Sequence, residues 1–295
     1  MTNTKVSIAT IITCHNRKEK TVNCLTNLMN QDVIADIDLS IYLVDDGSTD
    51  GTGDVAKQKF PRVTALQGDG LLYWNGGMRL AFSEAMKNDY DYYLWLNDDT
   101  FLYSDALKLL LETSKNMKQK IGGELIATGT IKDIETGEVI YGGRNQKSKL
   151  QPLKFILLEN SAEPQQCDTF NGNVVLIPRN VTKEIGNISS EFSKQHGGDF
   201  DYGLRAKYAG FESWVAPGII GTCSSNPIEG TIFDTSLSLK ERRKKMNTPR
   251  GVPPAKEWMI FAKRHAGILW PIYWLRTIVR VLFPWTYLYL RNPRR

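Results

Sequence analysis

Cysteine is scarce in this chain, and the spacing of the cysteines excludes two common uses of the residue. The four cysteines form no CxxC pair; they are Cys14, Cys24, Cys167 and Cys223. Neither a zinc finger nor a disulfide framework is therefore indicated. We expect free thiols in a protein that stays in a reducing compartment.

Two nucleotide-binding motifs and a secretion signal are also missing. The sequence contains neither GxxxxGK followed by Ser or Thr nor GxGxxG, so neither a P-loop NTPase nor a Rossmann dehydrogenase is favoured. The N-terminal residues lead directly into an apolar strand, without the charged and then apolar stretch of a signal peptide. We therefore expect the protein to be made and kept in the cytoplasm.

The overall composition is that of an ordinary globular protein. Of the 295 residues, 41% are hydrophobic and 23% are charged, which argues against global disorder. This length allows one large domain, or one domain plus an appendage. The net charge of +5 is too mild to indicate nucleic acid, and we expect no nucleic-acid partner.

Strands and helices alternate through the first hundred residues. Apolar periodicity predicts strands at 6–13, 39–44, 63–66 and 92–96, with helices at 18–30, from about 52, and at 77–88. Short loops join them, which is typical of right-handed βαβ units and a parallel sheet. The sequence therefore predicts an α/β fold.

The pattern changes after residue 120. We predict a hairpin at 126–131 and 138–141, a strand at 170–177, a helix at 199–209 and a short strand at 212–216. Residues 230–255 are polar, basic and rich in Pro and Gly. We predict a catalytic domain at 1–229, a basic linker at 230–255 and a helical appendage at 256–295.

Two adjacent carboxylates follow the strand predicted at 92–96. Asp98 and Asp99 stand where ligands bind in an open α/β sheet, outside the carboxyl ends of the strands. Two such charges about 4 Å apart repel by roughly 4 kcal/mol at an effective dielectric of about 20, so a cation is expected to offset them. Oxygen ligands suit Mg²⁺ or Mn²⁺. The alternative is that one Asp caps the next helix while the other is solvated.

Further acidic residues stand in similar positions. Asp45 and Asp46 end the second strand, and Asp199 and Asp201 begin a predicted helix. Because strands of a parallel sheet end on the same side, the first pair should meet the carboxylates at 98–99 in one cleft. A Gly-Gly pair at 76–77, placed at a helix N-terminus, can offer backbone N–H groups to phosphate. The sequence therefore predicts a nucleotide site built on carboxylates and a metal.

Three motifs carry a resemblance to a known family. They are Val-Asp-Asp-Gly-Ser-Thr-Asp-Gly-Thr at 44–52, Asn-Asp-Asp at 97–99 and Gly-Gly-Asp-Phe-Asp-Tyr-Gly-Leu-Arg-Ala at 197–206. In this order they resemble the family 2 inverting glycosyltransferases of the GT-A fold, over roughly residues 5–225. Trp-Asn-Gly-Gly at 74–77 and Asn-Gly-Asn at 171–173 look most like the rhamnosyl- and galactofuranosyltransferases that build bacterial surface polysaccharides.

The resemblance implies a nucleotide-sugar site on the strand-end loops. Asp45 would accept the imide N–H of uracil or thymine, with Asp46 nearby, and Thr13 would border the base. Asp98 would contact the ribose or the sugar. The other donor-side residues that the resemblance implies are Asn16, Arg17, Trp74, Asn75, Gly76 and Gly77.

The resemblance also implies a metal ion on the diphosphate. Asp99 would hold Mn²⁺ or Mg²⁺. The family often has a histidine after the final strand as a further ligand, but Cys223 stands in that loop here, and a thiol is a soft donor poorly suited to Mg²⁺. His196 is the substitute that the sequence offers. The third protein ligand stays open at this point.

On the acceptor side, the resemblance implies that Asp199 acts as the general base. It would remove the proton from the acceptor hydroxyl as this attacks the anomeric carbon, and a single displacement would invert the configuration. The other acceptor-side residues implied are Asn171, Gly172, Asn173, Asp201 and Arg205.

Each of these residues also has a purely structural interpretation. Asp199 could cap its helix, with Asp201 as the base instead. Arg205 could form an ion pair with these carboxylates, and Trp74 could be a packed loop aromatic. Asn-Gly-Asn at 171–173 could be a plain turn.

The C-terminal segment combines basic and aromatic residues. A basic run at 240–250 precedes a stretch from 266 to 290 that is dense in apolar residues. Arg276, Arg280 and two prolines make a membrane span marginal. We predict an interfacial helix pair on anionic lipid, with aromatic rings at headgroup depth from Trp270, Trp274, Trp285, Tyr287 and Tyr289. The alternative is packing on the catalytic domain or a homo-oligomer interface.

The sequence therefore predicts a metal-dependent inverting glycosyltransferase, peripheral on the inner face of a bacterial membrane. It would transfer a sugar from a UDP- or dTDP-sugar to a lipid-linked or polysaccharide acceptor in O-antigen or capsule synthesis. Two alternatives remain. A sugar nucleotidyltransferase would want a Gly-rich N-terminal loop with Arg and Lys, which residues 10–17 lack. An inactive, membrane-tethered glycan-binding subunit would not need Asp98, Asp99 and Asp199.

Overall fold

Alternating strands and helices build the N-terminal part of the fold, as the hydrophobic pattern predicts. They are β1 (Val6–Cys14), α1 (Lys18–Met29), β2 (Ile37–Asp45), α2 (Thr52–Lys59), β3 (Val63–Gln67), α3 (Tyr73–Ala85) and β4 (Tyr92–Leu96). The computed structural model describes residues 5–225, 228–248 and 251–285. In β1, Ile8 and Ile12 are buried on one face and Ile11 on the other. Burial on both faces is expected for a strand between two layers of helices.

Nine further strands, some of them only two or three residues long, and helices α4 to α6 follow among the described residues. They are β5 (Phe101–Leu102), α4 (Ala106–Ile121), β6 (Leu125–Asp133), β7 (Val139–Tyr141), β8 (Gly143–Ser148), β9 (Gln151–Leu157), β10 (Gln165–Cys167), β11 (Thr169–Phe170), β12 (Val174–Pro178), α5 (Arg179–Ile185), α6 (Gly198–Tyr208) and β13 (Glu212–Cys223). The predicted hairpin is confirmed, since β6 and β7 pair antiparallel. The strand predicted at 170–177 is broken into β11 and β12 at residues 171–173.

One large sheet joins most of these strands. The order of neighbours is β10-β13-β6-β12-β4-β1-β2-β3, with β5 beside β13 and β7 beside β6. The strands β3, β2, β1 and β4 run parallel, and β12 is inserted antiparallel between β4 and β6. The predicted α/β fold with a mostly parallel sheet is therefore confirmed. A smaller sheet, β11-β8-β9, stands beside it.

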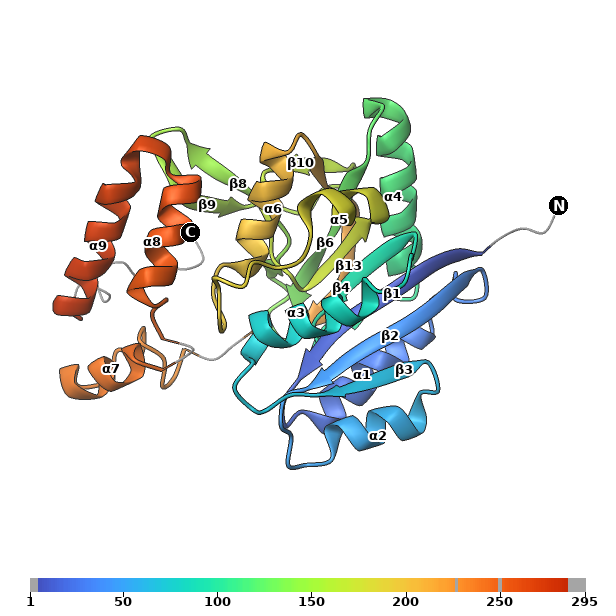
Figure 1. Ribbon diagram of the computed structural model, residues 1–295, viewed down its shortest axis with the longest axis horizontal. Coiled ribbons are helices and arrows are strands. Elements are labelled where there is room, and N and C mark those ends of the chain that lie inside the picture. The colour runs from blue at the N-terminus through green and yellow to red at the C-terminus, as the bar shows by residue number, and fades with distance from the viewer. Residues whose placement is uncertain (1–4, 226–227, 249–250, 286–295) are drawn as a thin grey trace.

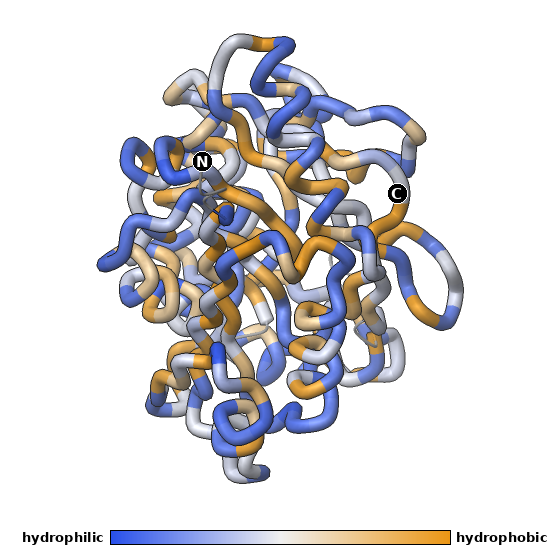
Figure 2. The backbone as a smooth tube through the Cα atoms, turned by 90° about the vertical axis from the view of Figure 1, so that its right-hand side faces the viewer, coloured by the Kyte–Doolittle hydropathy of each residue, from blue (hydrophilic) through white to orange (hydrophobic). Residues whose placement is uncertain are grey.

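Helices cover both faces of the large sheet (Figure 1). On one face, α1 and α4 pack Leu25, Leu28 and Leu107 against the strands. On the other, α3 and α6 contribute Phe82 and Tyr202. The most hydrophobic segments run through the middle of the fold, and hydrophilic loops surround them (Figure 2). The loops at the strand ends therefore extend from a sheet that is buried on both faces.

The described part of the C-terminal region contains the helices α7 (Leu239–Met246), α8 (Ala255–His265) and α9 (Trp270–Leu282), with a 3₁₀ turn at Gly267–Leu269. Helices α8 and α9 lie side by side at one end of the molecule (Figure 1), and Trp258 donates its indole N–H to the Tyr273 carbonyl between them. Among the described helices, none is long and apolar enough to cross a membrane. Tyr287 and Tyr289, predicted at headgroup depth, lie outside the described residues.

Candidate functional site

The carboxyl ends of β1, β2 and β4 meet at one edge of the sheet. Cys14 pairs with Asp45 in the parallel register, and the Asp46 amide donates to the Cys14 carbonyl at 2.9 Å. A cavity of about 550 Å³ opens here, and Arg17, Asp98 and Asp99 are among the residues that line it. A second cavity of about 310 Å³ shares Arg17 and Asp98 with the first. As predicted from the parallel strands, the two strand-end loops meet at one cleft.

Asp98 and Asp99 both bind the guanidinium of Arg17. Its Nη1 lies 3.1 Å from Asp98 Oδ1 and 2.7 Å from Asp99 Oδ2. Burial raises the pKa of Asp98 to about 7, although Arg17 opposes the shift, and the charge of Asp99 adds to it. Arg17 is thus the cation that offsets the two carboxylates in this structure.

Cys223 lies beside Asp99, but it is a poor ligand for a hard cation. Burial, and then the charge of Asp99, raise the pKa of its thiol, so it stays protonated near neutral pH. Within the described residues, no three His, Cys, Asp or Glu side chains gather closely enough to hold a metal ion. Among the described residues, the carboxylates at 98–99 are therefore the adjacent pair of oxygen ligands at this end of the cleft.

The structure does not bring His196 to Asp99. It lines a separate cavity beside α8, and its buried Nε2 has no hydrogen-bond partner among the described residues. This position argues against His196 as the substitute ligand, because a loop before α6 carries it away from the end of β4.

Asp45 and Asp46 serve different backbone segments. The carboxylate of Asp45 accepts from the amides of Ser48 and Gly53, both at 2.9 Å, and so holds the turn before α2. The carboxylate of Asp46 accepts from the loop at 70–73, with the Tyr73 amide at 2.9 Å. Asp46 lines the smaller cavity, together with Thr13, whereas Asp45 lines neither of the two.

The predicted start of the helix near residue 77 is wrong. Helix α3 begins at Tyr73, and the Gly76 amide already donates to the Leu72 carbonyl. A Cβ on Gly77 would lie 2.0 Å from Thr13 Oγ1, so this glycine lets α3 pack closely on β1. Neither glycine presents a free helix-terminal N–H to the cleft, because both lie inside the first turns of a buried helix.

Two asparagines of the predicted donor side hold loops. Asn16, at a φ of 51°, accepts from the Thr49 amide at 2.7 Å and stands outside both cavities. Asn75 is buried and donates to the His196 carbonyl at 3.1 Å. In contrast, Trp74 lines both cavities and donates its indole N–H to Asn97 Oδ1 at 2.8 Å.

Asp199 lies in the first turn of α6, beside the interruption between β11 and β12. Its carboxylate accepts from the Gly172 amide at 3.0 Å and the Phe200 amide at 2.8 Å. A little of the side chain reaches solvent, but protein surrounds the carboxyl group, and this desolvation raises its pKa. The two amides and the charge of Arg144 oppose the shift in part. A carboxylate with a raised pKa is suited to accept a proton.

The segment at 171–173 links Asp199 to the cleft. Asn171 accepts from Arg144 Nε at 2.9 Å, and the Asn173 carbonyl accepts from the Asn97 amide at 3.0 Å. Asn173 also lines the larger cavity. Residues 171–173 therefore connect Asp199, on the predicted acceptor side, to the larger cavity, on the predicted donor side.

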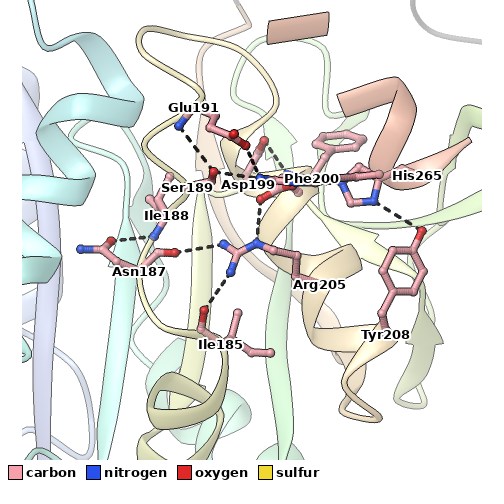
Figure 3. A network of polar contacts seen from close by, with 12 residues as sticks. Ile185, Asn187, Ile188, Ser189, Glu191, Asp199, Phe200, Arg205, Tyr208 and His265 are labelled. Atoms are coloured by element: carbon pink, nitrogen blue, oxygen red, sulfur yellow. Dashed lines mark hydrogen bonds and ion pairs between the residues drawn. The ribbon is translucent and has the colours of Figure 1, made fainter. Parts of the chain in front are cut away.

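Asp201 is fully buried in an ion network. It accepts from Arg205 Nε at 2.7 Å, Arg264 Nη1 at 2.9 Å and His265 Nε2 at 3.0 Å. Figure 3 shows Arg205 and His265 in this network, with Asp199 and Phe200 close by. Burial alone would raise the pKa of Asp201, but the hydrogen bond from His265, the charge of Arg205 and the hydrogen bonds from Arg264 and Arg205 outweigh it and lower the pKa. Asp201 thus ties α8 to α6 through Arg264 and His265, while Arg205 ties α6 to the carbonyls of Ile185 and Asn187.

The sequence pattern does not predict that residues 228–248 and Gly251 contribute to the cleft. Glu229, Thr231, Lys245 and Thr248 line the larger cavity, and Thr248 also lines the smaller one. The segment predicted as a linker is thus folded over the strand ends. Its buried Arg242 holds it together by donating to the carbonyls of residues 232 and 234. The cluster of basic residues at 240–250 is the signal in the sequence from which a phosphate contact could have been predicted.

Comparison with known proteins places these features in a family. The model of Glycosyl transferase family 2 matches residues 9–170, more than half of the chain. A solved mannosyltransferase from Pyrobaculum calidifontis, in complex with GDP-Man and Mn²⁺, is similar over 97% of this chain and 72% of its own, with a TM-score of 0.52 and 13% identity. At this identity, the likeness shows the fold alone. No curated protein sequence matches the chain.

Proposed function

This chain belongs to glycosyl transferase family 2, and from this premise we propose that it moves a sugar from a UDP- or dTDP-sugar to a lipid-linked glycan with inversion. The observation that carries the proposal is the convergence of Asp46, Asp98 and Asp99 on adjoining cavities at three strand ends. Their volumes, about 550 and 310 Å³, suit a nucleotide sugar. More specifically, we propose that the transferred sugar is a rhamnosyl or galactofuranosyl group and that the product is a bacterial surface polysaccharide.

We assign the base and ribose to the smaller cavity and the diphosphate and sugar to the larger. Thr13 and Asp46 border the smaller cavity, so Asp46, of the pair at 45–46, is the carboxylate that can meet the base. Asp98 borders both cavities and therefore stands at the junction of ribose and sugar. Trp74 also lines both cavities and so stands at the same junction.

The donor set fits a divalent cation that is shared with the diphosphate. Mg²⁺ and similar ions are often held by one or two carboxylates plus substrate phosphates and water, rather than by a full protein cage. Asp99, with Asp98, would hold Mn²⁺ or Mg²⁺, while Arg17 turns from the carboxylates to the phosphates. The bound ion would stabilise the negative charge of the departing diphosphate.

Asp199 is the proposed general base. Its raised pKa allows it to take a proton from an acceptor hydroxyl that reaches the first turn of α6. Gly172 and Phe200 fix the carboxylate through their backbone amides, so its orientation does not depend on mobile side chains. The acceptor oxygen would then attack the anomeric carbon from the side opposite the leaving diphosphate.

A transfer assay tests this function. Candidate UDP- and dTDP-sugars are incubated with a lipid-linked glycan acceptor and Mn²⁺, and NMR of the product gives the anomeric configuration. We expect transfer with inversion. Transfer of a nucleotidyl group, or a product that retains the donor configuration, would contradict the proposal.

We expect Lys245→Ala to weaken binding of the nucleoside diphosphate about tenfold, because one charge-assisted hydrogen bond contributes about 1.5–3 kcal/mol. Lys245 lines the larger cavity with Asp99, and within the described residues it pairs with no carboxylate. Titration calorimetry with the diphosphate and with the nucleoside alone measures the effect. The neighbour Lys244 is exposed and lines neither cavity, so Lys244→Ala is the matched control. Equal loss in both variants, or equal loss for the nucleoside, would refute a phosphate contact.

Helix α9 is proposed to lie on an anionic membrane surface at the inner face of the cell membrane. Ile272, Leu275 and Leu282 are each 57% exposed, and Ile268, one turn earlier, is 94% exposed. The positions recur every three to four residues and so share one helix face. Basic α7 lies at the end of this face, where Arg243 donates to the Leu282 carbonyl. An apolar face beside basic residues is typical of interfacial binding.

Replacing Ile272 and Leu275 together by Asp is expected to lower binding to anionic vesicles by at least tenfold. Burying each apolar side chain contributes about 1.5–3 kcal/mol, which the carboxylates remove. Vesicle flotation measures the bound fraction. Leu80→Asp, at an exposed apolar position on α3, is the control. Unchanged flotation of the double variant would contradict the membrane proposal, and loss of a dimer in its place would favour an oligomer interface.

A further inference from the structure

An apolar cavity lies apart from the carboxylate cleft, between β9, α6 and α8. Its volume is about 290 Å³, and much of its lining comes from Leu153, Phe155, Phe200, Trp258 and Phe261. Trp258 and Phe261 stack at 5.5 Å between ring centroids, and Phe155 meets Phe200 edge to face at 4.9 Å. This volume is at the lower end of small-molecule sites, and suits a small ligand or one end of a longer one.

The polar groups of this cavity carry no positive charge. Among the described residues that line it, none is Lys or Arg. Its carboxylate, Glu257, already accepts from the amide and hydroxyl of Ser193. Burial lowers the pKa of His196, so its imidazole is neutral near pH 7. A phosphate would lack a cation here and a sugar would lack enough hydrogen-bond partners, whereas a hydrocarbon chain needs neither.

The cavity is next to the proposed base. One wall is formed by His196, Gly197 and Phe200, and Asp199 stands between them in the sequence. Figure 3 shows Asp199 and Phe200 beside each other, close to His265 of α8. The opposite wall is α8, which packs against α9. The cavity therefore lies between the proposed base and the helix proposed to meet the membrane.

From this placement we infer that the cavity binds the hydrocarbon chain of a lipid-phosphate acceptor, at the end that carries the accepting sugar. The inference rests on the proposed function and gives the acceptor a site. A chain seated against Phe200 and Trp258 would place its polar head toward Asp199 and its remainder toward α9. The bound lipid would thereby help to hold the accepting sugar in position for its hydroxyl to attack the anomeric carbon of the donor.

Equilibrium dialysis with farnesyl phosphate tests the inference, with dimethylallyl phosphate as a probe that has the same head and a shorter chain. We expect saturable binding of farnesyl phosphate and at least tenfold weaker binding of the short probe. Leu153→Trp fills the cavity and should weaken farnesyl phosphate at least tenfold. Ile156→Trp adds the same bulk on the opposite face of β9, where Ile156 is 48% exposed, and should have no effect.

Leu153→Glu is a second variant, which places a charge at this partly exposed position of the cavity wall. It should also weaken the longer probe at least tenfold, with an unchanged melting temperature. Absence of saturable binding, or equal affinity in the wild type and both Leu153 variants, would overturn the inference. Because no sugar is transferred in this experiment, its failure is distinct from a failure of the proposed glycosyltransferase activity.

Discussion

Asp199→Asn is expected to lower the transfer rate about 10²- to 10⁴-fold, the range for loss of a general base. The amide oxygen of Asn can still accept from the Gly172 backbone, so the loop at 171–173 and the donor cleft should keep their form. Affinity for the nucleoside diphosphate should therefore stay near normal. Single-turnover transfer and titration calorimetry separate the two effects. If the variant still transfers at the wild-type rate, the base has been assigned to the wrong residue.

Asp201→Asn, two residues further on α6, is the matched control for this variant. Asp201 is buried with Arg205, Arg264 and His265, and removing one partner of a buried ionic group costs about 3–5 kcal/mol. We expect a lower melting temperature rather than a selective loss of catalysis. The pH profile adds a second readout: since desolvation raises the pKa of Asp199, the acid limb of kcat/KM should lie above the ordinary range of Asp.

Asp99→Asn is expected to abolish metal-dependent donor binding and to lower kcat/KM by about 10²-fold or more, because a carboxylate-held ion contributes several kcal/mol to the transition state. The neutral amide binds a hard cation weakly, and Arg17 loses its closer partner at 2.7 Å. Mn²⁺ binding in the presence of the nucleoside diphosphate, followed by electron paramagnetic resonance, measures the loss.

The control for Asp99→Asn is Asp105→Asn. Asp105 is exposed, lies just before α4 and lines neither cavity. It should leave metal binding unchanged. If Asp99→Asn retains the same dependence on Mn²⁺ as the wild type, the ion is held elsewhere. If the wild type shows no dependence on a divalent ion, Arg17 is the cation that serves the diphosphate.

The strand-end carboxylates could be found from the sequence because their placement depends on local pattern. An apolar strand followed closely by Asp-Asp predicts both the strand and the point where it ends, and parallel pairing then brings the loops at 45–46 and 98–99 together. The same reasoning located α6 and the position of Asp199 in its first turn. Local periodicity and strand direction sufficed for these features.

Other features depend on contacts between residues far apart in the chain. Nothing near Asp201 in the sequence reveals that Arg264 and His265, more than sixty residues later, surround its carboxylate. Asp45 holds the turn before α2 and Asp46 holds the loop at 70–73. This difference depends on which backbone amides turn toward each carboxylate. Helix α3 begins early, at Tyr73, a residue with a φ of 53°. The Asn75 amide in its first turn donates to the Lys194 carbonyl in the segment before α6, and helix propensity does not predict such a contact.

The C-terminal region illustrates the same limit. Its composition predicts an appendage joined by a basic linker, yet residues from 229–248 and Gly251 line the cleft at the strand ends, and α8 is tied to α6 by the Asp201 network. We therefore propose that catalytic and membrane-facing parts form one unit, and that deletion after residue 254 exposes the apolar face at Phe192 and Leu204. Point changes on α9 are for this reason better probes of membrane binding than truncation.

The central claim is that the cleft at the ends of β1, β2 and β4 binds a nucleotide sugar with the help of Asp99 and a divalent cation. Calorimetric titration of a panel of UDP-, dTDP- and GDP-sugars, with and without Mn²⁺, tests it most directly. The account predicts that a UDP- or dTDP-sugar binds, that Mn²⁺ strengthens the binding at least tenfold, and that Asp99→Asn removes this gain. Binding of no nucleotide sugar, or binding that neither Mn²⁺ nor Asp99→Asn alters, would contradict it.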